Sequence, residues 1–400
     1  MRVGPSQEEI RRSNLGALLR SVHLHGAMSR ADLTTSLGLN RSTIGALTAD
    51  LAAAGLVSEG VPREQRGRAG RPSLVVRPES EKVFVYAFAV EVDRIVAARV
   101  GLGGVLLDRF EAARPRGEHD AATVVAPIAE FVHKMQLTAL DRVKGAGARL
   151  IGSGAAVSAM VRRDDGYVRL GPQLGWADQP LGEALGVLVG DGRPVAVRNN
   201  ADLAALAEHT RGAAAGCDNL VYLYGDAGIG GGIIAAGRPV TGHGGYGGEV
   251  GHMVVNPNGK ACSCGSHGCW ETEIGEHALL AAAGRNATAG RDGILAVVDA
   301  ASRGDNTAQA AMRQVGDWLG FGVANLVNIF NPEMVIFGGT LREVYLASAA
   351  QVRSRLNRNG LPACREHVRL RTPQLGQDAA LIGAAELAFE PLFADPLDSA

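Results

Sequence analysis

The stretch GEVGHMVVNPNGKACSCGSHGCWE, residues 248–271, constrains the fold of this chain more than any other. Three of the five cysteines, Cys262, Cys264 and Cys269, fall within eight residues, and His252 lies ten residues before the first of them. Three thiolates and one imidazole make a complete tetrahedral ligand set for Zn²⁺, and a filled coordination shell is typical of a structural metal. The stretch therefore predicts a loop held in shape by a structural zinc ion.

The cysteine count and the hydropathy pattern also bear on the compartment. Five cysteines is an odd number, the N-terminus lacks an apolar signal-peptide core, and no apolar run approaches the roughly 18 residues of a membrane span. We therefore expect a cytoplasmic protein with no membrane partner, whose clustered cysteines bind metal rather than form disulfides. Cys217 and Cys364 stand apart from the cluster, and we expect them to be inert core residues.

Charge is unevenly distributed along the chain. Residues 1–80 contain eleven arginines against seven acidic residues, although the formal net charge of the whole chain is −1. A basic N-terminal block on an acidic body is typical of a DNA-binding module attached to a second domain.

The basic block carries the pattern of a helix-turn-helix. Apolar residues recur at helical spacing over 8–25, and Ser29 followed by Asp32 predicts the capped start of a second helix that runs to about Leu37. Gly38 supplies a turn, and a third helix is expected from about Thr43 to residue 54. The polar residues at the start of this third helix are candidates for base or phosphate contact: Asn40, Arg41, Ser42 and Thr43.

The segment REQRGRAGRP, residues 63–72, follows directly. Arginines interleaved with glycines can enter a narrow minor groove, so after a helix-turn-helix pattern we interpret the segment as a DNA-binding wing. The alternative is a solvated linker. Three wing residues join the candidate DNA contacts: Arg66, Arg68 and Arg71.

Residues 81–400 alternate strands and helices in two successive rounds, which predicts a two-lobed α/β body with a cleft between its lobes. The first round begins with VFVYAFAVEV and IVAARVGLGGVLL, which predict a β-hairpin with a glycine-rich corner. The second begins with VYLYGDAGIGGGIIAAG and continues to EMVIFGG.

Four motifs of the body, GEVGHM, CSCGSHGCWE, the helix start NNADLAALAE and NPEMVIFGG, together resemble the ROK family of repressors and sugar kinases. The N-terminal winged helix resembles that of the repressor branch, which the kinases lack. The resemblance implies an actin-like, ribonuclease H-like sugar-kinase fold. It divides the chain into a winged helix-turn-helix at 1–80, a first lobe at 81–205 and a second lobe with the zinc knuckle at 206–400, with the C-terminal helix returning to the first lobe.

The resemblance also implies two sets of site residues. The zinc ligands would be His252, Cys262, Cys264 and Cys269, with His267 as a rival ligand expected to point outward. The sugar-binding residues would be Asn199, Glu249, His252 and Glu271, with His252 shared between metal and sugar. Asn199 has a competing interpretation as a helix cap, and the two glutamates as exposed salt-bridge partners.

Kinase activity is not expected. In the kinases of this family an aspartate follows the sugar-binding asparagine and acts as general base, and here that position is Asn200, whose amide cannot accept the proton. The stretches that correspond to the phosphate loops carry Glu91 and Asp93 in the first and Asp226 in the second, and like charge repels phosphate. No GxxxxGK[ST] motif replaces them.

We therefore predict a non-enzymatic transcriptional regulator, a repressor of carbohydrate-utilisation genes, that acts as a homodimer or homotetramer on double-stranded operator DNA. It would sense a sugar or a sugar phosphate and carry a structural Zn²⁺. One alternative is an active, hexokinase-like or glucokinase-like ATP-dependent sugar kinase that also binds DNA. Another is a regulator controlled by a protein partner instead of a small ligand.

Overall fold

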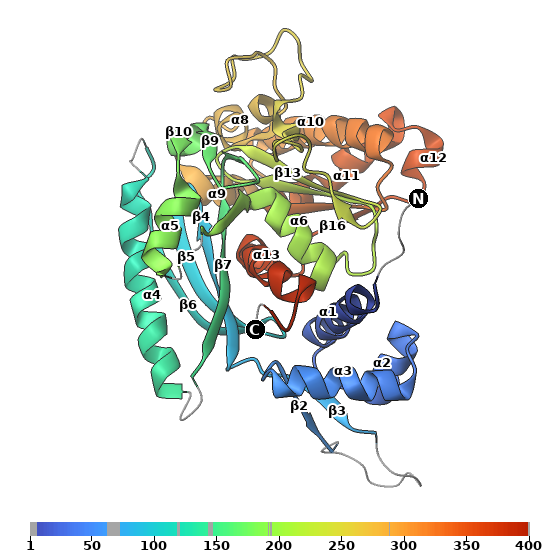
Figure 1. Ribbon diagram of the computed structural model, residues 1–400. Coiled ribbons are helices and arrows are strands. Elements are labelled where there is room, and N and C mark those ends of the chain that lie inside the picture. The colour runs from blue at the N-terminus through green and yellow to red at the C-terminus, as the bar shows by residue number, and fades with distance from the viewer. Residues whose placement is uncertain are drawn as a thin grey trace.

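The computed structural model describes residues 6–61, 73–117, 121–142, 147–190, 192, 194–287 and 289–398. A small N-terminal domain lies below a larger two-lobed body (Figure 1). The elements of the N-terminal domain are α1 (Gln7–His25), β1 (Met28–Ser29), α2 (Arg30–Leu37), α3 (Arg41–Ala53), β2 (Val57–Gly60) and β3 (Val75–Pro78).

The helices expected in the N-terminal domain are confirmed. Ser29 and Asp32 form the capping box of α2, and Gly38 ends this helix in the left-handed conformation, with φ of 65°. The side chain of Asn40 then caps α3 by accepting from the Thr43 amide. β3 pairs antiparallel with β1, which precedes α2, and with β2, which follows α3, so a small sheet flanks these two helices, as in a winged helix-turn-helix. The predicted wing residues Arg66, Arg68 and Arg71 lie outside the described residues.

The body follows in two parts. The first comprises β4 (Val83–Val90), β5 (Arg94–Gly101), β6 (Val105–Ala113), α4 (Ala122–Arg142), β7 (Arg149–Val157), β8 (Met160–Val161), β9 (Val168–Gly171), η1 (Pro172–Leu174), β10 (Trp176–Gln179), α5 (Leu181–Val189), β11 (Ala196–Asn199) and α6 (Asn200–Arg211). The second comprises β12 (Leu220–Gly225), β13 (Ile229–Ala235), β14 (Arg238–Pro239), η2 (Val250–His252), α7 (Glu271–Ile274), α8 (Glu276–Ala282), α9 (Gly290–Ser302), α10 (Asn306–Phe330), β15 (Met334–Gly339), α11 (Leu341–Asn359), α12 (Pro362–Arg365), β16 (Arg369–Arg371), η3 (Gly376–Asp378) and α13 (Ala379–Ala394).

The two large sheets repeat one topology, as the two rounds of strands and helices predicted. Their strand orders are β6-β5-β4-β7-β11 and β14-β13-β12-β15-β16. In each sheet three consecutive strands pair antiparallel, and two further strands add in parallel on the other side of the first strand. This is the ribonuclease H-like arrangement that the resemblance implied.

The predicted β-hairpin is confirmed, because β4 pairs antiparallel with β5. The stretch IVAARVGLGGVLL continues through its glycine-rich corner from β5 into β6, so the sheet opens with a three-stranded meander. Gly103 and Gly104 have φ values of 95° and 75° and form the turn between these strands, because such angles are accessible to glycine at little cost.

The two sheets share a central helical layer. Side chains that alternate along β4 pack on different cores: Val85 faces the core that contains α13, and Phe84 faces the core that contains α4 and α5. Tyr222 of β12 reaches the α13 core from the second sheet, so α6 and α13 lie between the sheets (Figure 1). A Cβ atom at Gly383 of α13 would overlap the carbonyl oxygen of Leu203 in α6, so these helices are in close contact.

The same central core continues into the N-terminal domain. Leu18 of α1 and Ile44 of α3 are fully buried and belong to one cluster with Phe389 of α13. The N-terminal domain is therefore packed on the body through apolar contacts. Within the described part of the chain, none of the helices combines the length and the apolar character that crossing a membrane would require.

Candidate functional site

A cavity between the two lobes brings together the four predicted sugar-binding residues. Asn199 reaches it from the end of β11, Glu249 and His252 from the turn around η2, and Glu271 from the start of α7. The empty volume of the cavity, with its open mouth, is about 740 Å³. Its position between two lobes is typical of a small-molecule site.

Asn199 acts as a helix cap and also lines the cavity. Its Oδ1 accepts from the backbone N–H of Ala201 at 2.7 Å, which caps α6, and its Nδ2 donates to the carbonyl oxygen of Ala159 at 3.1 Å. The alternative interpretation as a cap is therefore correct for the side-chain oxygen. One amide hydrogen and one oxygen lone pair remain for a ligand.

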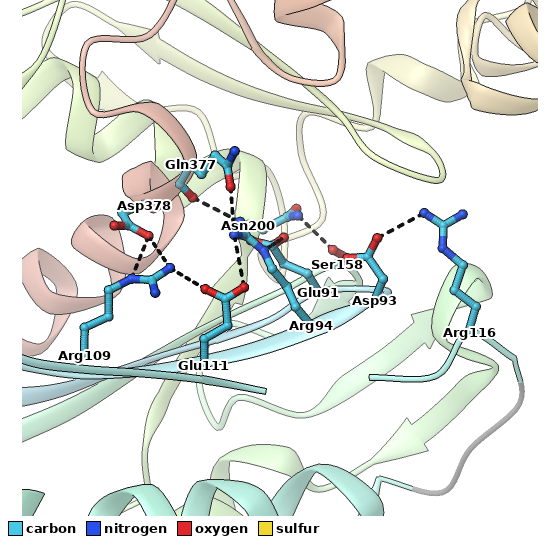
Figure 2. Close-up of polar contacts among 10 residues, drawn as sticks. All are labelled: Glu91, Asp93, Arg94, Arg109, Glu111, Arg116, Ser158, Asn200, Gln377 and Asp378. Atoms are coloured by element: carbon cyan, nitrogen blue, oxygen red, sulfur yellow. Dashed lines mark hydrogen bonds and ion pairs between the residues drawn. The ribbon is translucent and has the colours of Figure 1, made fainter. Parts of the chain in front are cut away.

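Asn200 is the first residue of α6 and is 4% exposed. Its Nδ2 donates to Ser158 Oγ at 2.8 Å (Figure 2), and both residues line the cavity. Because the amide nitrogen is used in this way, Oδ1 is left to accept a hydrogen bond. An amide oxygen accepts hydrogen bonds but does not remove a proton at neutral pH.

The predicted metal ligands form one compact group. The Sγ atoms of Cys264 and Cys269 are 3.6 Å apart, His252 Nδ1 lies 3.7 Å from Cys262 Sγ, and all four ligand atoms lie within 4.8 Å of one another. A tetrahedral zinc ion with Zn–S bonds of ~2.3 Å places its sulfurs ~3.8 Å apart. The group can therefore hold a metal ion. His267 is exposed and lies outside the group, as do Cys217 and Cys364.

The metal group and the cavity share residues. His252 presents Nδ1 to the cysteine cluster while its ring lines the cavity. Glu271 also borders both, because its Oε1 lies 2.9 Å from Cys262 Sγ and 3.7 Å from His252 Nδ1. A metal ion in the group would hold these side chains in place at the cavity wall.

The turns that correspond to phosphate loops lie at the interlobe end of the cavity. The β4–β5 turn carries Glu91 and Asp93, and the β12–β13 turn carries Asp226, which lines the cavity. Glu91 and Asp93 are paired with internal arginines (Figure 2), whereas Asp226 Oδ2 has no hydrogen-bond partner among the described residues. Arg94 donates to both oxygens of Glu91, at 2.6 and 2.8 Å, and to Gln377 at 3.1 Å.

A second arginine joins the two lobes. Arg116, which follows β6, donates to Asp93 at 3.2 Å and to Glu276 of α8 at 2.6 Å. Glu276 is 1% exposed, so this ion pair is sheltered on the side of the second lobe. The interlobe space is therefore bridged by a contact within the protein.

Burial changes the acidity of three carboxyl groups near the cavity. It raises the pKa of Asp226 to about 7, with help from the charges of Glu91 and Asp93. It also raises the pKa of Glu249, and it raises that of Asp202 to about 8 together with the charge of Glu249. Asp202 does not line the cavity.

Several cavity residues were missed by the sequence interpretation. Gln173, Leu170 and Met160 come from the small β8–β9–β10 sheet and its η1 turn, and Tyr224 comes from the end of β12. The residues of the small sheet carry no motif, and only the fold brings them to the cavity. Tyr224 directly precedes the Gly225–Asp226 pair, so its position next to a predicted loop was a usable signal.

Four of the seven predicted DNA-contacting residues lie together at the start of α3. Asn40, Arg41 and Ser42 are exposed, and Thr43 is half-buried. Ser42 Oγ donates to Asn40 Oδ1 at 2.7 Å, and the same oxygen accepts from the Thr43 amide at 2.8 Å. Asn40 is thus committed in part to capping, whereas Arg41 is the one full charge of this set.

The fold and the cavity define a two-lobed protein of the sugar-kinase type that carries an additional N-terminal winged-helix domain. The chain belongs to the ROK family, whose sequence pattern matches residues 93–390. The xylose repressor of Caldicellulosiruptor bescii is 28% identical over 396 residues, which cover 95% of this chain and 96% of that protein. The glucokinase of Streptomyces coelicolor is 33% identical over 278 residues, covering 64% of this chain and 85% of that protein.

Solved structures show the same difference in coverage between regulators and kinases. A ROK family transcriptional regulator, described as a homologue of the E. coli MLC protein, matches with a TM-score of 0.77 at 25% identity, covering 97% of this chain and 98% of that one. A ROK family glucokinase from Streptomyces griseus in complex with glucose and AMPPNP matches with a TM-score of 0.64 at 29% identity, covering 76% and 99%. The likeness to the repressor and the regulator thus extends over the whole chain, whereas the glucokinases match part of it.

Proposed function

We propose that this chain is a transcriptional repressor of carbohydrate-utilisation genes that binds operator DNA through its winged helix and senses a sugar or sugar phosphate in the interlobe cavity. The observation that carries the proposal is the winged helix itself. It is joined to the body through a continuous core and lies within the full-length likeness to a xylose repressor. Repressors of this kind bind DNA with a recognition helix in the major groove.

We further propose that the chain is not a kinase. Asn200 provides an amide where a general base would be needed, and such a base is typically worth about 10²–10⁴-fold in rate. The hollow beside the β4–β5 and β12–β13 turns is lined by four carboxylic acids, among them Glu91, Asp93 and Asp226, against two arginines, and this excess of negative charge disfavours the phosphates of a nucleotide. The opposing candidate is an active sugar kinase that also binds DNA.

An activity assay separates these two functions. Purified protein is incubated with ATP, Mg²⁺ and a panel of pentoses and hexoses, and ADP release is measured. We expect no sugar-dependent release above the background without protein. Sugar-dependent turnover at rates typical of enzymes, about 1 s⁻¹ or more, would replace our proposal with the kinase function.

We propose Zn²⁺ as the metal of the His252–Cys262–Cys264–Cys269 group and assign it a structural role. Three thiolates and an imidazole fill a tetrahedral shell, so no position remains for a substrate. The ion would hold Glu249, His252 and Glu271 around the cavity. Its chemistry would be confined to keeping this loop folded.

The DNA interface is proposed at the start of α3 and in the wing. Replacing Arg68 and Arg71 together with Ala should lower operator affinity and reduce the slope of log K against log salt by about 1.8, since each phosphate contact contributes about 0.9. Arg303 is an exposed arginine of the body, and its substitution by Ala is the matched control. A double variant with an unaltered salt slope would remove the wing from the interface.

The regulatory mechanism that we propose needs at least two copies of the chain. In a homodimer or homotetramer, two winged helices would bind half-sites at a fixed spacing. The functional units would be 1–80, 81–205 and 206–400. A sugar that favours one degree of lobe closure would change the spacing of the winged helices and release the operator.

A further inference from the structure

We propose that the effector is an uncharged sugar and that the cavity discriminates against its phosphate ester. The inference deepens the proposed function, because it rests on the cavity being the effector site. It selects between the two effector classes, sugar and sugar phosphate, that the proposed function leaves open.

The charge of the cavity wall supports this inference. Three carboxylic acids line the cavity, Asp226, Glu249 and Glu271, and the described lining residues include no lysine or arginine. The remaining polar lining consists of amides, hydroxyls, Tyr224, His252 and Cys264. Carboxylates and amides suit the hydroxyl groups of a sugar. A hydroxyl can donate a hydrogen bond to a carboxylate, and it can both donate to and accept from an amide. A phosphate dianion would meet negative charge at low dielectric without a cation.

Arg94 and Arg116, the two arginines at the turns beside the cavity, are already paired within the protein. Arg94 is held by Glu91, and Arg116 is held by Asp93 and Glu276. Neither guanidinium lines the cavity. Recruiting either one to a phosphate would leave a sheltered carboxylate without its partner, which offsets the attraction gained.

The adjoining hollow toward the second lobe offers no better position for a phosphate. It shares Tyr224 and Asp226 with the cavity, and it is lined by four carboxylic acids against two arginines, one of which is the paired Arg94. The four acids are Glu91, Asp93, Glu111 and Asp226, and the second arginine is Arg291. A ligand extended in this direction would still meet an excess of negative charge.

One cation lies on the opposite side. Lys260 lines a second hollow that shares Gln173, Ser263 and Glu271 with the cavity. In this direction the phosphate of a ligand would meet a lysine, and it would pass the carboxylate of Glu271 on the way. Lys260 therefore marks the competing geometry that a test has to exclude.

The test compares matched pairs of ligands on the full-length protein. The probes are D-xylose, D-glucose and N-acetyl-D-glucosamine, each with its own terminal phosphate ester, titrated calorimetrically at pH 8 and 150 mM salt. This pH lies above the pKa of about 7 of Asp226. We expect at least one free sugar to bind and its ester to bind at least about 10-fold more weakly. An ester that binds as tightly as its free sugar, or more tightly, would overturn the inference.

Two variants test the charge argument directly. Asp226→Asn removes one carboxylate without changing its shape, so the preference for the free sugar should narrow by a few-fold, while Asp164→Asn, an exposed aspartate outside the cavity, should leave it unchanged. Lys260→Ala should leave the preference unchanged too. If Lys260→Ala instead abolishes binding of an ester, the phosphate binds in the second hollow and the inference is wrong.

The outcomes for the inference and for the proposed function are distinguishable. Binding of esters alone would remove the inference and keep a sugar-sensing repressor. Binding of no probe, free or phosphorylated, with operator binding intact, would remove both the inference and sugar sensing and leave a DNA-binding protein controlled in another way. Melting temperatures of the variants without ligand show whether each one is folded.

Discussion

The first lobe meets its neighbours through two regions that use their polar groups in opposite ways. Where it meets the winged helix, the polar groups around the buried His23 are bonded to one another. Where it meets the second lobe, at the cavity, several polar groups face an open space. The difference separates a contact that fixes geometry from a site that can accept a ligand.

The junction with the winged helix is centred on His23 of α1, which is fully buried between Phe389 and Phe393 of α13. Its Nδ1 accepts from the backbone N–H of Gly103 at 2.9 Å, so the ring proton lies on Nε2, which is 3.2 Å from each oxygen of Glu386. Burial lowers the pKa of His23, which favours this neutral ring. Both ring nitrogens are therefore satisfied.

Arg211, near the end of α6, completes the junction. Its guanidinium donates to Glu386 and also to the carbonyl oxygens of Gly103 and His23, at 3.2 and 3.0 Å. Burial alone would raise the pKa of Glu386, but the hydrogen bonds from His23 and Arg211, together with the charge of Arg211, outweigh it and lower the pKa. The carboxylate of Glu386 is thus ionised, and both of its oxygens have hydrogen-bond partners.

The cavity differs in each of these respects. The Oδ2 atom of Asp226 has no hydrogen-bond partner among the described residues, and Asn200 keeps its Oδ1 free of the Ser158 contact. The two regions are connected by α6, which begins at the cavity with Asn200 and ends at the junction with Arg211. A displacement of the first lobe by a ligand would therefore move the winged helix with it as one body.

The largest expected effect of a single substitution lies at the junction. Glu386→Ala removes the carboxylate and leaves the guanidinium of Arg211 and the Nε2–H of His23 buried without it. Loss of one partner of a buried ion pair typically costs about 3–5 kcal/mol. We expect the free energy of unfolding, measured with urea, to fall by about this amount.

Glu390 supplies the matched control one helical turn further along α13. It pairs with Arg20, but the two side chains are 46% and 40% exposed, so Glu390→Ala should cost less than about 1 kcal/mol. If Glu386→Ala and Glu390→Ala lower the free energy of unfolding equally, the junction contributes no more than a surface ion pair. The proposed difference between the junction and the cavity would then be wrong.

A second prediction concerns the metal group at the cavity. Cys264→Ser should lower metal affinity by more than about 100-fold, because even groups that only support a ligand change affinity by about 10–100-fold. Bound zinc is measured by elemental analysis, together with sugar affinity and operator affinity. We expect sugar response to be lost while operator binding in the absence of sugar persists, since α3 lies in another domain.

Cys364→Ser is the control, because Cys364 lies outside the metal group. It should retain about one zinc per chain. Retention of the full zinc content by Cys264→Ser would remove Cys264 from the ligand set. If Cys264→Ser lowers operator affinity as much as it lowers the response to sugar, the loop supports the whole fold rather than the cavity alone.

These two regions were predicted from the sequence to very different extents. The metal group could be predicted because its ligands lie close along the chain, and the four residues that the structure brings to the cavity were implied by the resemblance to the ROK family. The helix bounds around Ser29, Gly38 and Asn40 were predictable for the same local reason, since a cap involves residues three apart.

The junction could not be predicted, because His23, Gly103, Arg211 and Glu386 are brought together by the packing of α1, α6 and α13, and no local pattern marks any of them. The pairing of Arg116 with Glu276 was missed for the same reason, since 160 positions separate the two residues. The phosphate-loop acids were recognised from the sequence, but their internal neutralisation required the tertiary structure.

The smallest expected effect is a pH-dependent change in the free energy of unfolding when Asp226, whose Oδ2 has no partner among the described residues, is replaced. Because the pKa of Asp226 is raised to about 7, the folded state holds a proton that the unfolded state has lost above about pH 4. Stability contributed by this group therefore falls as the pH rises from about 4 to 7, and stays low above that range. Asp226→Asn removes this cost, so the variant should match the wild type near pH 4 and exceed it at pH 8.

The full pKa shift corresponds to about 4 kcal/mol, but the side chain is half-buried and water reaches part of it, so we expect a gain of about 1–2 kcal/mol. The charged groups facing Asp226 are Glu91, Asp93 and Arg116, and none of them is changed. Urea unfolding of both proteins between pH 4 and 8, with Asp164→Asn as an exposed control, measures the difference. A gain that is constant across this range would come from packing rather than from the proton. A loss at pH 8 would mean that the carboxylate is stabilised by the fold, and that the cavity, like the junction, satisfies its own polar groups.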